Sequence, residues 1–128
     1  MAFLDTYGPW ALVTGASSGL GEHYARQLAQ RGLHVIVVAR REERLRTLAE
    51  QIEAEFGVRV LVVALDLLEI NAIAKLAKLI GRRNLGLVVS NAGFGSTGPF
   101  LKLDPQMMTR MIRLNCEIPV SLIHALGP

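Results

Sequence analysis

Short apolar runs alternate with longer segments of helical period along most of the chain. Four runs are rich in Val and Leu and contain few polar residues: 10–14, 34–39, 59–65 and 86–90. Apolar runs of this length without polar alternation are typical of parallel strands that are buried on both faces. The pattern therefore predicts four parallel strands.

The segments between these runs repeat apolar residues at helical spacing and predict helices over 19–31, 41–56 and 69–80. A glycine directly follows each helix and is expected to end it: Gly32, Gly57 and Gly81. In the third helix the spacing predicts one apolar stripe, made of Ile70, Ile73, Ala74, Ala77 and Ile80.

A last helix is predicted after the glycine-rich segment 91–98. Asp104 is a suitable N-cap, and Pro105 suits the first helical position, where no backbone N–H is needed. Pro119 lies inside the same helical pattern. Because proline lacks an N–H and clashes with the preceding turn, we expect it to kink or break this helix.

The strand–helix–strand rhythm repeats three times with a period of about 30 residues, which is the size of a βαβ unit. Crossovers of this kind are almost always right-handed. The fold class is therefore α/β, a Rossmann-type doubly wound parallel sheet, in a single domain over residues 1–128. No fifth strand is predicted, so we expect the fold to be truncated after the fourth strand and its following helix.

The segment VTGASSGLGEHYA joins the first predicted strand to the first predicted helix and contains Gly15, Gly19 and Gly21. In such a loop the backbone N–H groups and the helix N-terminus converge where the helix dipole favours negative charge. The strand–turn–helix context therefore predicts a site for the pyrophosphate of a dinucleotide. A glycine-rich turn without a ligand is the alternative.

The residue after the second strand bears on which dinucleotide would bind. An acidic side chain about 20 residues after the glycine loop would select a free ribose 2′-hydroxyl, but the chain has Arg40 there, followed by Arg41. A guanidinium pairs instead with a 2′-phosphate. The sequence thus favours NADP(H), with NAD(H) possible; alternatively, both arginines only begin a solvated helix.

Four motifs in order resemble the short-chain dehydrogenase/reductase family: Thr14-Gly15-xxx-Gly19-x-Gly21, Asp66, Asn91-Ala92-Gly93 and Asn115. The resemblance covers essentially the whole chain, and four spaced motifs are more specific than any one. The opening YGPWALVTGASSGLG is also similar to steroid and long-chain 3-ketoacyl reductases of that family. The two asparagine motifs argue against a methyltransferase, another α/β class with a glycine loop after its first strand.

The resemblance implies roles for individual residues. It assigns pyrophosphate binding to Gly15, Ser17, Ser18, Gly19, Leu20 and Gly21. It places Asp66 and Leu67 at the adenine, and it places Asn91, Ala92 and Gly93 at the adenine ribose. It makes Asn115 a catalytic residue, whose backbone carbonyl helps to hold a water of the proton relay. A helix N-cap for Asp66 and an ordinary turn at 91–93 are the alternatives, and Ser90 departs from the family's commoner asparagine.

The family's chemistry also needs a serine and a tyrosine that is followed four residues later by lysine. The chain has no such pair, because Tyr7 and Tyr24 are followed at that spacing by Ala11 and Leu28. The resemblance implies an NADP(H)-binding portion of an oxidoreductase that, when complete, interconverts a carbonyl and a secondary alcohol by hydride transfer. We expect this chain alone to be inactive. The alternatives are a nucleotide-responsive binding or interaction module, or a gene fragment without function.

Composition excludes several other classes of protein and site. Cys116 is the only cysteine, which excludes an internal disulfide and a cysteine cluster for a metal, so no metal site is expected. The net charge of +3 comes from arginine and lysine without interleaved aromatic residues, so we expect no nucleic-acid partner.

No apolar run approaches the ~18 residues of a membrane span, and the first ten residues lack a basic leader and an apolar core. We therefore expect no membrane partner and a cytoplasmic location. In the family that the sequence resembles, the last helix contributes to a subunit interface. The resemblance thus implies a homo-oligomer, or self-association through this helix.

Overall fold

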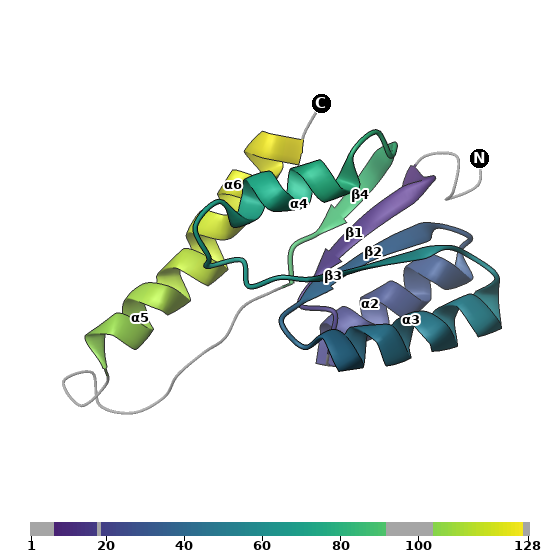
Figure 1. The fold of residues 1–128 in the computed structure, drawn as a ribbon, viewed down its shortest axis with the longest axis horizontal. Helices are drawn as coiled ribbons and strands as arrows, with labels where there is room; N and C mark the ends of the chain where they lie inside the picture. Colours follow the sequence, from purple (N-terminus) through teal and green to yellow (C-terminus); the bar gives the residue numbers. More distant parts are fainter. Residues whose placement is uncertain (1–6, 18, 92–103, 127–128) are drawn as a thin grey trace.

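The computed structural model describes residues 7–17, 19–91 and 104–126. Its strands are β1 (Trp10–Thr14), β2 (His34–Ala39), β3 (Val60–Ala64) and β4 (Leu85–Val89). Its helices are α2 (Gly19–Gln30), α3 (Glu42–Phe56), α4 (Ala72–Ile80), α5 (Pro105–Ile112), the π-helical segment η2 (Arg113–Glu117) and α6 (Ile118–Leu126). The strand order is β3-β2-β1-β4 and every neighbouring pair is parallel (Figure 1). The predicted doubly wound Rossmann-type sheet is confirmed.

Helices cover both faces of the sheet (Figure 1). Successive residues of a strand point to opposite faces, so Ala11 and Val13 of β1 pack in one apolar cluster and Leu12 packs in the other. The first cluster contains buried residues of α2 and α3, and the second contains buried residues of α4 and α6. The core is therefore two apolar layers separated by the sheet.

The two central strands are the most buried parts of the chain. Residues 11–14 of β1 and 35–38 of β2 are fully buried, as the uninterrupted apolar runs predict. β4 has only β1 beside it in the described part of the chain, and its residues are half-buried or exposed. Among the described residues β4 is therefore an edge strand.

The start predicted for the third helix is wrong by three residues. The Oδ1 of Asp66 accepts a hydrogen bond from the backbone N–H of Leu68 at 3.0 Å, and the N–H of Glu69 donates to the carbonyl of Asp66 at 3.0 Å. These bonds form a turn, and Asn71 then has a positive φ of 62° directly before α4. The helix can begin only after this turn, at Ala72.

The stripe predicted for the third helix is correct only in part, because Ile80 is buried and Ile73 packs against the second apolar cluster. The buried residues of α4 are Ala72, Leu76 and Ile80, at a spacing of four. Ile70 lies before the helix and is 86% exposed, and Ala74 is exposed as well. Only Ile80 of the predicted stripe is buried. Ile70 falls outside the stripe because the helix begins only at Ala72.

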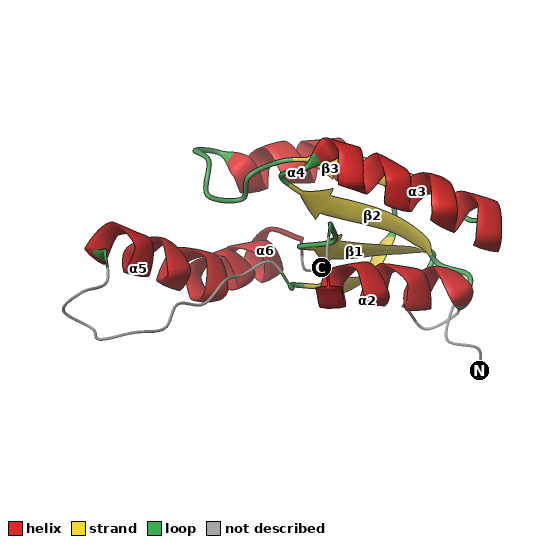
Figure 2. Cartoon of the chain, turned by 90° about the horizontal axis from the view of Figure 1, so that it is seen from below, coloured by secondary structure: helices red, strands yellow, loops and turns green. Residues whose placement is uncertain are grey.

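Pro119 does not break the last helix, but the helix departs from regular α-helical geometry just before it. α5, η2 and α6 follow one another directly, and α5 extends beyond the sheet (Figure 2). The N–H of Ile118 donates to the carbonyl of Arg113, five residues earlier, so the helix widens just before the proline. Pro119 then lies in the first turn of α6, where its missing N–H is tolerated.

The predicted beginning of the last helix is confirmed. The Oδ1 of Asp104 accepts a hydrogen bond from the backbone N–H of Gln106 at 3.0 Å, and Pro105 is the first helical residue.

Among the described residues no helix has the length and apolar character to cross a membrane.

Leu76 and Leu79 of α4 offer a matched test of the core. Leu76 is fully buried and Leu79 is 52% exposed on the same helix. Leu76→Ala is expected to lower the free energy of unfolding by about 2–5 kcal/mol, because it leaves a cavity against the sheet. Leu79→Ala is expected to change it by less than about 0.5 kcal/mol. Urea denaturation followed by circular dichroism measures both, and equal losses would contradict this packing.

Candidate functional site

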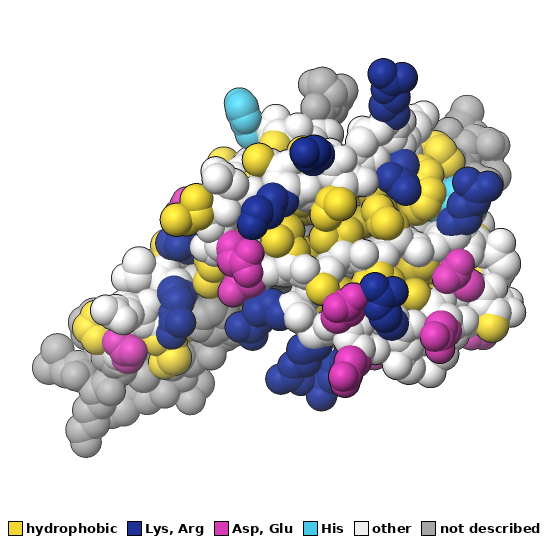
Figure 3. Space-filling view, in the orientation of Figure 1, with side chains coloured by type: hydrophobic (Ala, Val, Ile, Leu, Met, Phe, Trp, Pro, Cys, Tyr) yellow, Lys and Arg dark blue, Asp and Glu magenta, His cyan; other side chains and the backbone are white. Residues whose placement is uncertain are grey.

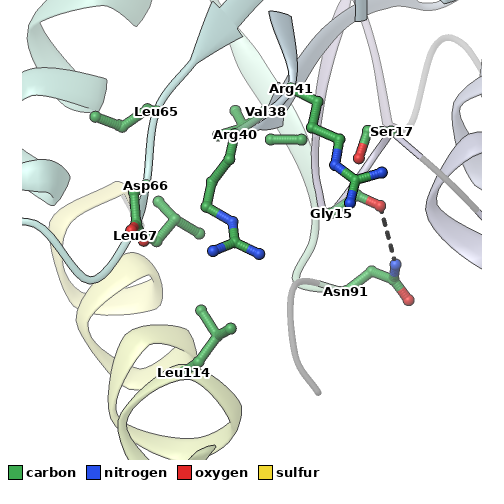
Figure 4. A pocket seen from close by; sticks show the side chains of 11 residues that line it. Gly15, Ser17, Val38, Arg40, Arg41, Leu65, Asp66, Leu67, Asn91 and Leu114 are labelled. Atoms are coloured by element: carbon green, nitrogen blue, oxygen red, sulfur yellow. Dashed lines mark hydrogen bonds between the residues drawn. The ribbon is translucent and has the colours of Figure 1, made fainter. Parts of the chain in front are cut away.

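A cavity of about 280 Å³ lies where the carboxyl ends of the parallel strands meet (Figure 4). Its walls come from four strand ends and one helical segment: Gly15, Ser17, Val38, Ala39, Arg40, Arg41, Leu65, Asp66, Leu67, Asn91 and Leu114. Ligands of open α/β sheets bind at this edge, beside the strand at which the connections change direction. Here that strand is β1, which lies between β2 and β4.

The glycine loop has the backbone geometry that only glycine adopts readily. Gly15 has a φ of 66° and Gly19 has a φ of 57°, both in the left-handed region. The N–H of Ala16 donates to the carbonyl of Val38 at 3.2 Å and fixes the loop to the end of β2. α2 begins at Gly19, so its N-terminus and unpaired N–H groups lie beside this loop.

Gly21 is buried beneath the loop, where α2 lies against Gly15 and Asn91. A Cβ atom there would lie 1.9 Å from the carbonyl oxygen of Gly15 and 2.8 Å from the Nδ2 of Asn91. This is the role of a glycine that allows close helix–sheet packing. Gly21 therefore supports the cavity without lining it.

Asn91 connects the end of β4 to the glycine loop. Its backbone N–H donates to the Oγ1 of Thr14 at 2.9 Å, and its Nδ2 donates to the carbonyl of Gly15 at 3.4 Å. Thr14 is fully buried at the end of β1. Asn91 itself therefore joins the end of β4 to the floor of the cavity.

Two arginines supply the positive charge of the cavity. Arg40 extends into its middle, and Arg41 points toward Ser17 and Gly15 (Figure 4). Within the described ranges neither guanidinium has a carboxylate within salt-bridge distance, whereas Arg46 of α3 pairs with Glu42 at 2.6 Å. Because no described carboxylate lies within salt-bridge distance of them, Arg40 and Arg41 can pair with an anionic group in the cavity.

Asp66 lines the cavity and does not cap α4. Its Oδ1 accepts the hydrogen bond from Leu68, and the N-cap position of α4 is Asn71. The alternative reading of Asp66 as the helix N-cap is therefore wrong. Leu67 beside it is buried, and Leu65 and Leu114 are partly buried, so this part of the cavity has apolar walls.

The cavity brings together predicted residues that are far apart in sequence: Gly15, Ser17, Arg40, Arg41, Asp66, Leu67 and Asn91. Three other predicted residues lie outside its lining. Gly19 borders a neighbouring groove between α2 and α3, Leu20 is 63% exposed, and Gly21 lies beneath the loop. Ser18, Ala92 and Gly93 fall outside the described residues.

Asn115 does not line the cavity. It is exposed on η2, whereas the preceding residue, Leu114, forms part of the wall. Sequence reasoning missed Leu114 and three strand-end residues: Val38, Ala39 and Leu65. The three strand-end residues could have been predicted, because they directly precede Arg40 and Asp66 in the sequence. For Leu114 the sequence offered only its position beside Asn115. The catalytic role of Asn115 stays a prediction.

The arrangement of strands, glycine loop and strand-end residues agrees with comparisons to known proteins. A family model described as short chain dehydrogenase matches residues 9–128. The chain belongs to the short-chain dehydrogenase/reductase family. It is 35% identical to a 7beta-hydroxysteroid dehydrogenase of Clostridium sardiniense, and the match covers 97% of this chain and 48% of the relative. It is also 35% identical to a very-long-chain 3-oxoacyl-CoA reductase of Meyerozyma guilliermondii, with 94% and 37% covered.

Solved structures agree with this family. A short-chain dehydrogenase from Sphingobium yanoikuyae in complex with NADPH is 34% identical, with a TM-score of 0.88. The match covers 94% of this chain and 48% of that one. The chain thus spans about half the length, or less, of the short-chain dehydrogenase/reductase relatives that it matches. These matches support a dinucleotide as the cofactor.

Gly21→Ala tests the packing beneath the cavity, because the two physical effects of this substitution change the free energy of unfolding in opposite directions. Helix propensity alone favours alanine over glycine by about 1 kcal/mol, whereas the short distance to Gly15 predicts overpacking that costs about 1–3 kcal/mol. We expect lower stability in thermal or urea unfolding and weaker binding of a dinucleotide. His23→Ala, on the exposed side of the same helix, should change neither. A stabilised Gly21→Ala chain would show that the close packing is wrong.

Proposed function

We propose that the chain is the NADP(H)-binding portion of a short-chain oxidoreductase. The observation that supports this most is that Arg40 and Arg41, without salt-bridge partners in the described part of the chain, line the same cavity as the glycine loop. Gly15 and Ser17 would hold the pyrophosphate at the N-terminus of α2. The arginines would hold the 2′-phosphate, and Asp66 and Leu67 would contact the adenine.

In the complete enzyme, we propose, hydride passes between the nicotinamide and a carbonyl or secondary alcohol. The cofactor supplies this chemistry, and the residues of this chain bind and orient it. The relatives named above act on a hydroxysteroid and on a very-long-chain 3-oxoacyl-CoA. We therefore propose a large, mainly apolar substrate for the complete enzyme.

We also propose self-association through the last helix. Ile112, Val120 and Ile123 are 64%, 68% and 66% exposed on the helical segment that runs from α5 to α6. Contact with a second copy of the chain would remove these aliphatic side chains from water.

Replacing Arg40 tests the preference for NADP(H). Arg40→Ala should weaken NADPH binding roughly ten- to hundredfold, because a hydrogen bond to a charged group contributes about 1.5–3 kcal/mol. NADH lacks the 2′-phosphate, so its affinity should change little. Isothermal titration calorimetry measures both affinities. The control Arg46→Ala removes an arginine that lies outside the cavity and pairs with Glu42, and it should leave both affinities unchanged. Equal losses of NADPH and NADH affinity in Arg40→Ala would refute the preference for NADP(H).

A nucleotide-responsive binding module is the second candidate function. It is favoured by the cavity itself, because the glycine loop and the strand-end residues that line it all belong to this chain. The 128-residue chain should bind NADPH, and its Tm should rise with concentration, because NADPH at a hundred times Kd stabilises the folded state by about 2.7 kcal/mol. It should not oxidise NADPH in the presence of a ketone. Turnover above background would contradict the binding module, and an unchanged Tm at millimolar NADPH would contradict both candidates.

A further inference from the structure

Charge is distributed unevenly along the chain. The segment from Ile70 to Asn91 contains four lysines and arginines and none of the chain's 11 acidic residues. The four are Lys75, Lys78, Arg82 and Arg83. A local excess of positive charge creates a potential that attracts negatively charged partners, in addition to keeping the surface solvated. The segment corresponds to α4, the turn after it and β4.

The fold gathers these cations on one surface, here called the α4 basic face and made of Lys75, Lys78, Leu79, Arg82 and Arg83. All five residues are exposed. Lys75 lies 3.8 Å from Glu69, and the structure gives Lys78 and Arg82 no salt bridge with any described residue. Figure 3 shows Lys and Arg side chains along α4 and over the turn that follows it, with acidic side chains next to the start of α4 and on the side of α3.

The α4 basic face also has apolar and aromatic parts. Leu79 is 52% exposed between the cations. The guanidinium of Arg83 lies 5.1 Å from the ring centroid of Trp10, and its Nη1 donates to the carbonyls of Leu79 and Ile80 at 3.1 and 3.2 Å. Trp10 is half-buried and is the only tryptophan of the chain. The end of α4 thus combines positive charge, an exposed leucine and an indole.

This combination matches one class of surface. A bilayer with anionic lipids attracts lysine and arginine, and its interface accepts leucine and tryptophan side chains. Nucleic acid would use the cations but would gain little from an exposed leucine. We propose that the α4 basic face is a docking surface for an anionic lipid bilayer. This contact lies at the surface of the bilayer and involves no membrane span, and it departs from the expectation of no membrane partner.

Docking in this orientation is compatible with nucleotide binding. The turn with Arg82 and Arg83 leads into the amino end of β4, and Trp10 is the first residue of β1. Since the strands are parallel, this edge of the sheet lies opposite the carboxyl edge, where the cavity opens. A bilayer held at the α4 basic face would leave the cavity open.

Sedimentation with lipid vesicles tests the proposal on the 128-residue chain. We expect binding to phosphatidylcholine vesicles that contain about 30% phosphatidylserine, little binding to pure phosphatidylcholine, and strong weakening at about 0.5 M salt, where the Debye length falls to a few ångströms. The fluorescence of Trp10 should shift to shorter wavelength on binding. Absence of binding to both kinds of vesicle would overturn the proposal.

Paired variants separate the α4 basic face from net charge. Lys78→Gln with Arg82→Gln should lower the partition coefficient by about tenfold or more. Arg44→Gln with Arg46→Gln, which removes the same charge from α3, should lower it less than about twofold. Equal losses in the two double variants would overturn the proposal.

Leu79→Asn distinguishes lipid from other polyanions. This variant should weaken binding to the vesicles, because it removes the apolar contact and leaves every charge in place. Circular dichroism checks that each variant keeps its helices. Vesicle binding that Leu79→Asn leaves unchanged, together with equally tight binding to DNA, would assign the face to nucleic acid and overturn the proposal.

Discussion

The candidate site depends on the contact between the end of β4 and the glycine loop. The buried hydroxyl of Thr14 accepts the N–H of Asn91, which is 77 residues later in the sequence, and Asn91 also donates to Gly15. Gly21 packs against Gly15 and Asn91, and the space between them leaves no room for a Cβ atom at Gly21. One junction therefore fixes β1, β4 and α2 relative to one another, and the cavity forms above it.

The sequence was sufficient wherever a local pattern determines the structure. β1 and β2 have the predicted bounds, because the central strands of a parallel sheet are apolar on both faces and leave a continuous signal. Arg40, Asp66 and Asn91 meet at one edge for a topological reason, since each follows a strand of a parallel sheet. Their convergence could be expected without knowledge of any contact.

The sequence was insufficient where hydrogen bonds compete locally. The turn at Asp66 delays α4 to Ala72, and apolar spacing alone gives no sign of it. Likewise, the π-helical turn at Arg113–Glu117 lets the last helix continue to Pro119 and beyond, and it is the segment that places Leu114 in the cavity wall. A sequence pattern with a fixed period of 3.6 residues predicts neither the turn at Asp66 nor the π-helical segment.

Parallel strands give this sheet two chemically different edges. At the carboxyl edge, strand ends and the N-terminus of α2 converge, and this geometry suits an anionic ligand. α4 links the edges, because the chain enters it from the turn at Asp66, beside the cavity, and leaves it at Arg82 and Arg83. An anion in the cavity and an anionic surface at the far end of α4 would therefore contact different cations. The two kinds of binding could therefore coexist, because they would use opposite edges of the sheet.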